Sequence, residues 1–175
     1  MVVVEMAETG HAEGICRVGT VSWRDAYSDV LAAEYVEANV RSRYDPERIA
    51  EQIADVDEVG EWLVALDRGG GGGANESVVG TVRDDRPEPG VGEVSGLYVH
   101  PDWQGEGVGS RLLSVLTERQ RAAGATEQHT YVFAGNDPAT GFYESKGFEA
   151  DERFAAAAVD GVEPDAAAVR FVRSL

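Results

Sequence analysis

The chain has 175 residues, which is enough for one domain with a hydrophobic core and too few for two ordinary domains. Because 43% of the residues are hydrophobic, the composition excludes a disordered acidic tail. The 15 basic and 32 acidic side chains give a formal net charge of −17, which repels phosphate backbones and anionic lipids, so neither nucleic acid nor a membrane is an expected partner.

The first third of the chain is predicted to be one strand followed by helices. Residues 2–6 have the apolar pattern of a short strand. Apolar spacing then predicts three helices, over residues 11–30, 32–40 and 45–56. Thr9 is the expected N-cap of the first helix, and the third is expected to begin with Asp45 as cap and Pro46 at its first helical position.

The rest of the chain is predicted to consist of strands separated by single helices. Strands are expected over residues 61–67, 77–82, 93–100, 128–133, 148–154 and 168–173. The five glycines at 69–73 predict a flexible link, residues 84–92 predict turns, and residues 155–167 predict a mobile loop. This order of elements indicates an α/β or α+β layered fold with a mixed sheet.

Two helices are expected among these strands. The first, over residues 107–123, is expected to end at Gly124 and to turn an apolar stripe toward the sheet. The stripe consists of Val108, Leu112, Val115 and Leu116. The second, over residues 138–146, is expected to be capped by Asp137 and ended by Gly147.

The basic residues are almost all arginine, because Lys146 is the one lysine in the chain. Acidic residues are spread along the whole length. This composition resembles that of cytoplasmic proteins from salt-accumulating halophiles, in which molar salt shortens the screening length to about 3 Å. An ordinary acidic protein is the alternative. An acidic surface of this kind carries no information about the charge of the substrate.

A few residues indicate the cellular compartment and whether a metal site is expected. Cys16 is the single cysteine, so an intrachain disulfide and a cysteine-based metal cluster are excluded. The short apolar N-terminus soon meets acidic residues, and no apolar run approaches the roughly 18 residues of a membrane span, so a cytoplasmic location is expected. The three histidines have no ligand spacing, and no metal is expected.

A glycine-rich segment between a predicted strand and a predicted helix is the clearest chemical signal. Residues 104–109 read QGEGVG, and such a loop brings backbone N–H groups close to a ligand at the positive end of a helix, where phosphate binds well. The P-loop pattern GxxxxGK[ST] is excluded because the lysine is missing. A dinucleotide fingerprint fits poorly, since Ser110 takes the third small position and Glu127 precedes its strand. A simple packing turn is the alternative.

Two segments together resemble the GNAT (Gcn5-related) N-acetyltransferase family. The segment LYVHPDWQGEGVGSRLL contains a loop of the form [QR]xxGx[GA], and NDPATGFYESKGF follows after one predicted strand; the similarity covers residues 93–148. The resemblance implies a single domain over residues 1–175 with a mixed, mostly antiparallel sheet of six to seven strands flanked by helices. It also implies transfer of an acetyl group from acetyl-CoA to a primary amine by direct attack in a ternary complex.

Carried onto this chain, the resemblance implies a binding site for the cofactor. The backbone of the loop would wrap the CoA pyrophosphate, through Gln104, Gly105, Glu106, Gly107, Val108, Gly109 and Ser110. At the splayed end of the fourth strand, Leu97, Tyr98 and Val99 would pair with the pantetheine arm, and an amide near Leu97 or Tyr98 would polarise the thioester carbonyl. Asn136 would contact the cofactor near its pantetheine end. The alternatives are core strand residues for Leu97 and Val99 and a loop cap for Asn136.

The resemblance also implies two catalytic residues. Tyr143 would be the general acid that protonates the leaving thiolate; alternatively it packs as an aromatic beside Phe142 and Phe148. The amine must lose a proton before it attacks, and Glu93 is the best candidate base, on one face of its strand with Ser95. A water chain could replace it as the base, and Glu93 would then be a solvated charge.

One residue departs from the family pattern, and the acceptor stays open. Many relatives have a basic residue where this chain has Glu106, so its carboxylate is expected to repel CoA at low salt, and cofactor affinity is expected to rise with KCl. Trp23, Tyr27, Tyr35 and the 155–167 loop are candidates for the acceptor pocket, or simply core. The acceptor could be a small-molecule or peptide amine, and a homodimer is possible. An acyl-CoA-binding sensor without turnover and a dinucleotide-binding module are the alternative functions.

Overall fold

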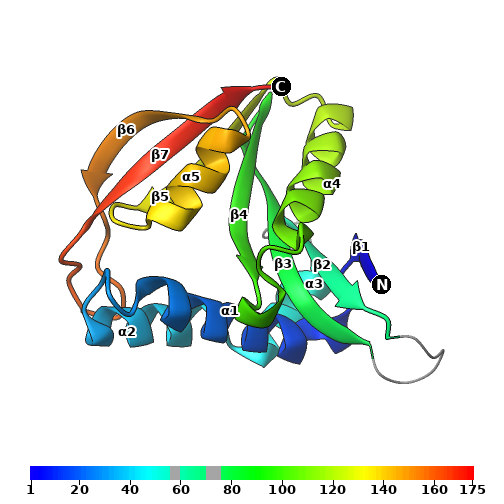
Figure 1. The fold of residues 1–175 in the computed structure, drawn as a ribbon, viewed down its shortest axis with the longest axis horizontal. Coiled ribbons are helices and arrows are strands. Elements are labelled where there is room, and N and C mark those ends of the chain that lie inside the picture. Colours follow the sequence, from blue (N-terminus) through cyan, green and yellow to red (C-terminus); the bar gives the residue numbers. More distant parts are fainter. Residues whose placement is uncertain (56–59, 70–75) are drawn as a thin grey trace.

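The computed structural model describes residues 1–55, 60–69 and 76–175. Its centre is a seven-stranded sheet in the order β1-β2-β3-β4-β5-β7-β6 (Figure 1). The central neighbours β4 and β5 run parallel, and the other neighbouring strands pair antiparallel. This arrangement confirms the predicted mixed, mostly antiparallel sheet. The strands are β1 (Val2–Met6), β2 (Glu61–Asp67), β3 (Ser77–Glu88), β4 (Val91–Val99), β5 (Glu127–Phe133), β6 (Glu149–Ala155) and β7 (Ala167–Ser174).

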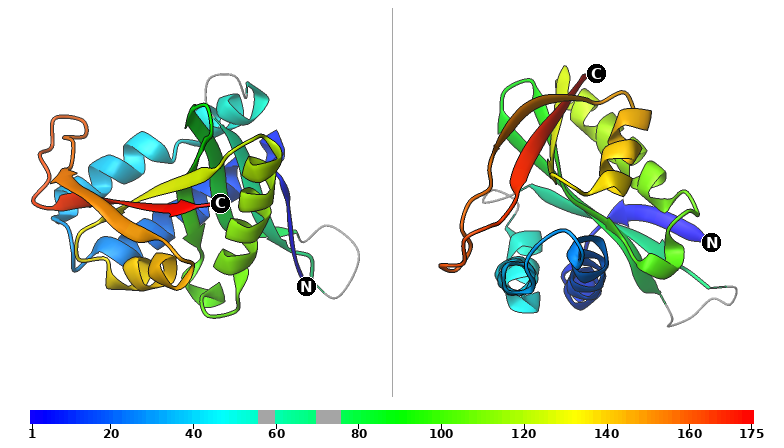
Figure 2. Two further views of the ribbon diagram at one scale, coloured as in Figure 1. Left: turned by 90° about the horizontal axis from the view of Figure 1, so that it is seen from above. Right: turned by 60° about the vertical axis from the view of Figure 1, so that its left-hand side comes forward.

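Helices cover both faces of the sheet. They are α1 (Ala12–Tyr27), α2 (Ala33–Arg43), α3 (Pro46–Ala54), α4 (Val108–Ala122) and α5 (Asp137–Ser145), with short 3₁₀ turns at Thr9–His11 and Pro101–Trp103. The first three helices lie on one side, and α4 and α5 lie on the other (Figure 2). In β2 the even-numbered Trp62, Val64 and Leu66 pack with α1 and α3, whereas Leu63 and Ala65 pack with α4. Because both faces are buried, β2 reads as a continuous apolar run.

The turns expected over residues 84–92 occur only at residues 89–90, and the expectation is wrong for the rest of this segment. β3 continues to Glu88, and the chain turns only at residues 89–90, where Gly90 has φ +82°. Aspartate is rare in strands, but here its charges are compensated: Arg86 lies 2.7 Å from Asp84, and Arg83 lies 2.7 Å from Asp85. Pairing with β4 therefore outweighs the local preference for a turn.

Two predicted helix caps are also wrong. Thr9 lies inside a 3₁₀ turn, because Glu8 and His11 cap each other reciprocally there. Asn136, rather than Asp137, caps α5 by accepting a hydrogen bond of 3.2 Å from the Ala139 N–H. Asp45 is confirmed as the cap of α3.

Of the remaining expectations, some concern residues that the structure describes and one lies outside them. Gly124 and Gly147, with φ values of +95° and +88°, end α4 and α5 as predicted. Residues 70–73 of the glycine run lie outside the described residues. Between β6 and β7, a short β-bridge joins Val159 and Val162. In the part of the chain that the structure describes, no helix is long and apolar enough to cross a membrane.

Candidate active site

The site begins where the two parallel central strands separate. β4 and β5 pair from Val91 opposite Glu127 as far as Val94 opposite Thr130. At this last pair the Thr130 hydroxyl donates a 3.0 Å hydrogen bond to the Val94 carbonyl oxygen. Beyond it the strands diverge (Figure 1), and a groove of about 550 Å³ lies between them. Unpaired strand backbone at this position can accept an extended ligand as an added strand.

A β-bulge occurs in β4 directly after the split. Arg83 of β3 pairs with Ser95 and Thr81 pairs with Tyr98, so two residues of β4, Gly96 and Leu97, face one residue of β3. Gly96 has φ +58°, a conformation that favours glycine. Both residues of the bulge line the groove, and a bulge interrupts the regular backbone pairing of its strand. The glycine inside a predicted strand was the sequence signal for it.

The glycine-rich loop forms one end of the groove. Gly105 and Gly107 have φ values of +79° and +81°, and α4 begins at the next residue, Val108. The N–H groups of the first helical turn have no carbonyl partner within the helix, and the helix dipole adds positive potential there. The Gln104 side chain donates a 3.2 Å hydrogen bond to the Val99 carbonyl oxygen and so ties the loop to β4. This geometry fits a phosphate group.

Almost all predicted cofactor residues line the groove. Those that do, together with the predicted acid, are Leu97, Tyr98, Val99, Gln104, Gly105, Gly107, Val108, Gly109, Ser110, Asn136 and Tyr143. The exception is Glu106, which is exposed and does not line it. Asn136 also donates a 3.2 Å hydrogen bond to the Tyr27 hydroxyl, in addition to capping α5. Its amide therefore joins the groove to α1.

Tyr143 is both a packed aromatic and a wall of the groove. Its ring lies 5.2 Å from that of Phe142 and 5.3 Å from that of Phe148, measured between centroids. Burial raises the pKa of Tyr143 to about 12, although interaction with the Thr130 hydroxyl acts in the opposite direction. The phenol therefore stays protonated at neutral pH, and it can act as a hydrogen-bond donor.

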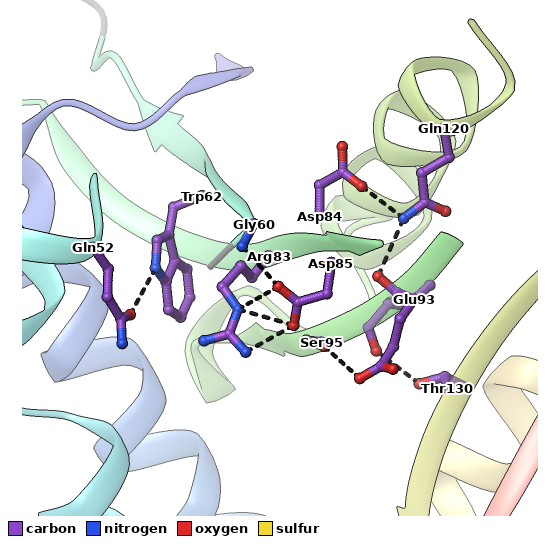
Figure 3. Close-up of polar contacts among 11 residues, drawn as sticks. Gln52, Gly60, Trp62, Arg83, Asp84, Asp85, Glu93, Ser95, Gln120 and Thr130 are labelled. Atoms are coloured by element: carbon purple, nitrogen blue, oxygen red, sulfur yellow. Dashed lines mark hydrogen bonds and ion pairs between the residues drawn. The ribbon is translucent and has the colours of Figure 1, made fainter. Parts of the chain in front are cut away.

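Glu93 lies on β4 and faces a second cavity. The Ser95 hydroxyl donates a 3.0 Å hydrogen bond to Glu93 Oε1, which confirms that the two residues share a face (Figure 3). Burial raises the pKa of Glu93 above its ordinary value; the nearby Asp85 charge also raises it, and the Ser95 hydrogen bond lowers it. A carboxylate with a raised pKa is a stronger base when ionised.

A buried amide holds the backbone of Glu93 in place. Gln120 of α4 is fully buried, and its side-chain N–H groups donate to the Glu93 carbonyl oxygen at 3.1 Å and to Asp84 Oδ1 at 2.9 Å (Figure 3). Sequence reasoning missed this residue. The available signal was its position four residues after Leu116, where the apolar stripe of the helix continues with a polar residue.

The second cavity, called the acceptor cavity below, has a volume of about 610 Å³ and lies between α1, α2, α3 and the split strands. Trp23, Tyr27 and Tyr35 line it, as do residues 156, 157 and 159 of the predicted loop. These aromatic rings are also buried in a core cluster, with the Trp23 and Tyr27 centroids 4.5 Å apart. The acceptor cavity and the groove share lining residues at the split, among them Tyr98.

Comparison with known proteins relates this architecture to a family. Residues 58–150 match the model of the acetyltransferase (GNAT) domain. The chain is 23% identical over 140 residues to spermidine N(1)-acetyltransferase of Thermoplasma acidophilum, covering 80% of this chain and 83% of that protein. It is 32% identical over 143 residues to mycothiol acetyltransferase of Brachybacterium faecium, covering 74% of this chain and 41% of that longer protein.

Solved structures share the fold at low sequence identity. The PaiA N-acetyltransferase of Thermoplasma acidophilum in complex with coenzyme A has a TM-score of 0.79 at 19% identity, covering 100% of this chain and 99% of that one. The YncA structure from Salmonella typhimurium with acetyl-CoA has a TM-score of 0.71 at 19% identity, covering 99% and 94%. This chain therefore shares its overall fold with these structures.

Proposed function

Because the chain belongs to the GNAT acetyltransferase family, we propose that it transfers the acetyl group of acetyl-CoA to a primary amine by direct attack in a ternary complex. The observation that carries this proposal is the groove at the β4–β5 split. The N-terminus of α4 lies at one end of the groove. The other end adjoins the acceptor cavity. A thioester and an amine can therefore reach the same point from two sides.

Three features of the groove would bind three parts of acetyl-CoA. The backbone amides of residues 104–110 would hold the pyrophosphate, because they lie in and before the first turn of α4. The backbone of Leu97, Tyr98 and Val99 would pair with the pantetheine arm beside the bulge. An amide near Leu97 or Tyr98 would polarise the thioester carbonyl oxygen.

Glu93 and Tyr143 would move the protons. An alkylammonium group with a pKa of about 10 must lose a proton before it can attack, and Glu93 faces the acceptor cavity from the strand that lines the groove. The Tyr143 hydroxyl, held protonated by burial, would donate to the departing thiolate, whose acid has a pKa of about 8.5. The two residues thus lie on the amine side and on the groove side of the split.

The test is thiol release from acetyl-CoA with a panel of primary amines at high KCl. We expect release that depends on the amine and is saturable in both substrates. Binding of acetyl-CoA without release for any amine would instead favour a non-catalytic acyl-CoA sensor. Stabilisation against heat by NAD but not by CoA would favour the dinucleotide-binding alternative.

We also propose the cellular compartment, the substrates and the oligomeric state of the protein. The absence of disulfide partners for Cys16 and the acidic, lysine-poor composition support a cytoplasm with high salt. The acceptor is a small-molecule or peptide amine, and acetyl-CoA is the co-substrate. Sedimentation of the purified protein at several salt concentrations tests whether a homodimer forms.

A further inference from the structure

The acceptor cavity is positively charged although the whole chain is strongly acidic. Three arginines line it, namely Arg43, Arg48 and Arg83, and among the described lining residues the one acidic side chain is Glu93. Arg83 is already neutralised, because it makes a two-pronged contact with Asp85. Arg43 and Arg48 therefore supply the uncompensated charge in a protein whose net charge is −17.

Arg43 is held in a fixed position at the C-terminal end of α2. Its Nε donates a 3.1 Å hydrogen bond to Asn39 Oδ1, and its guanidinium lies 5.2 Å from the centroid of the Trp23 ring. Asn39 is itself fully buried, and its side-chain N–H donates to the Tyr35 carbonyl oxygen at 2.9 Å. The cation is thus preorganised before a ligand arrives, which lowers the entropic cost of binding.

Arg48 lies in the first turn of α3, across the α2–α3 turn from Arg43. Its Nη1 donates a 2.8 Å hydrogen bond to the Ser42 carbonyl oxygen. Asp45, the acidic residue between the two arginines in sequence, accepts from the Arg48 backbone N–H as a helix cap. Both arginines are exposed, and neither has a carboxylate within salt-bridge distance among the residues described here; Arg24, which is also exposed, pairs with Glu37 at 2.8 Å.

We propose that the acceptor is a small molecule carrying a carboxylate as well as the amine, and that the carboxylate binds Arg43 and Arg48 while the amine faces Glu93. This inference rests on the proposed function. The planar guanidinium fork matches a carboxylate geometrically, and the cavity volume of about 610 Å³ suits a small organic ligand. A polyamine would instead bring positive charge against both arginines.

The experiment compares acceptors that differ only in the carboxylate. Each amino acid of a panel is assayed for thiol release beside its carboxamide and its decarboxylated amine, with spermidine as the polycation, at low and high KCl. We expect kcat/KM for the amino acids to exceed that for their carboxamides at least tenfold, with a smaller ratio at high salt because ions screen the contact. Equal or better use of carboxamides or spermidine overturns the inference and leaves the proposed function intact.

Variants locate the effect at the two arginines. Arg43→Gln and Arg48→Gln should each reduce the ratio of amino acid to carboxamide kcat/KM, and the double variant should reduce it furthest. Arg121→Gln makes the same change in net charge at an exposed position of α4, outside the acceptor cavity, and should leave the ratio as in the wild type. Unchanged ratios in the double variant overturn the assignment of these arginines. An unchanged KM for acetyl-CoA shows that each variant is folded.

Calorimetry tests the inference by measuring binding, without the need for catalytic turnover. Titration of the same pairs into the protein saturated with CoA measures recognition of the carboxylate directly. Amino acids that bind more tightly than their carboxamides support the inference even if no amine releases thiol, a result that would overturn the proposed function alone. Equal binding of both overturns the inference.

Discussion

At the scale of single residues, the role proposed for Glu93 as the base requires its carboxyl group to be ionised. Because burial raises its pKa and only the ionised form accepts a proton, kcat should rise with pH through an apparent pKa above the ordinary value of a carboxyl group. Glu93→Gln should lower kcat about 100-fold or more and remove this rise. A variant with the kcat and pH profile of the wild type would show that a water chain is the base.

The same substitution should not destabilise the fold. A carboxyl group whose pKa is raised in the folded state contributes stability at low pH, and this contribution is lost as pH rises through the folded pKa. At neutral pH the wild type therefore carries the cost of a partly buried charge, which the amide avoids. Thermal unfolding at neutral pH should give Glu93→Gln a Tm equal to or above that of the wild type.

Ser95 is expected to act as a positioning residue for that base. Its hydroxyl donates to Glu93 Oε1 at 3.0 Å and so favours the ionised carboxylate. Ser95→Ala should move the rise of kcat to higher pH, whereas Ser95→Thr should restore it by keeping a hydroxyl. A purely structural role for Ser95 would change stability and leave the apparent pKa of the profile where it is.

Tyr143 can be tested by removing one atom. Tyr143→Phe keeps the ring that packs between Phe142 and Phe148 and deletes the hydroxyl. We expect a fall in kcat of about 100-fold with little change in the KM for acetyl-CoA, as for loss of a general acid. Full kcat in this variant would mean that Tyr143 serves only to pack the groove wall.

At the scale of elements, the stability of the sheet depends on how closely the residue before β2 approaches β3. A Cβ at Gly60 would overlap the backbone carbonyl of Asp84, which cannot move without disturbing the strand. Gly60→Ala should therefore destabilise the protein by about 1–3 kcal/mol in urea unfolding. Gly141→Ala in α5 is the matched control, since a Cβ there meets no atom within 4 Å, and it should stabilise by about 0.5–1 kcal/mol. Equal stability of the two variants would contradict the predicted clash.

At the scale of the whole molecule, the net charge of −17 opposes an anionic co-substrate. Salt shortens the screening length from about 10 Å at 0.1 M to about 3 Å at 1 M, so it weakens the repulsion between CoA and the carboxylates of the chain, including that of Glu106 in the glycine-rich loop. Acetyl-CoA should therefore bind more tightly at about 2 M KCl than at about 0.1 M. Weaker binding at the higher concentration, measured by calorimetry, would show that direct cationic contacts dominate.

Local patterns along the chain were sufficient to predict the features that depend on neighbouring residues. The loop at 104–110, the stripe from Val108 to Leu116 and the stop at Gly124 are local patterns, and they predicted a strand, a loop and a helix as well as the GNAT family. Local preference failed at Asp84, where ion pairs and strand pairing keep the chain extended. The secondary-structure propensity of a segment reflects only a few neighbouring residues, so it does not account for such long-range contacts.

Contacts between residues far apart in the sequence could not be predicted from such patterns and came from the folded structure. The divergence of β4 from β5 follows from the register of strand pairing and from the bulge at Gly96. The periodicity of apolar residues along the chain does not predict which residues of two strands pair. Gln120 reaches the backbone of Glu93 from another element, and Arg43 reaches the acceptor cavity because α2 packs beside the split strands. Side chains far apart in sequence become neighbours through packing, since burial of the apolar faces fixes where each helix lies.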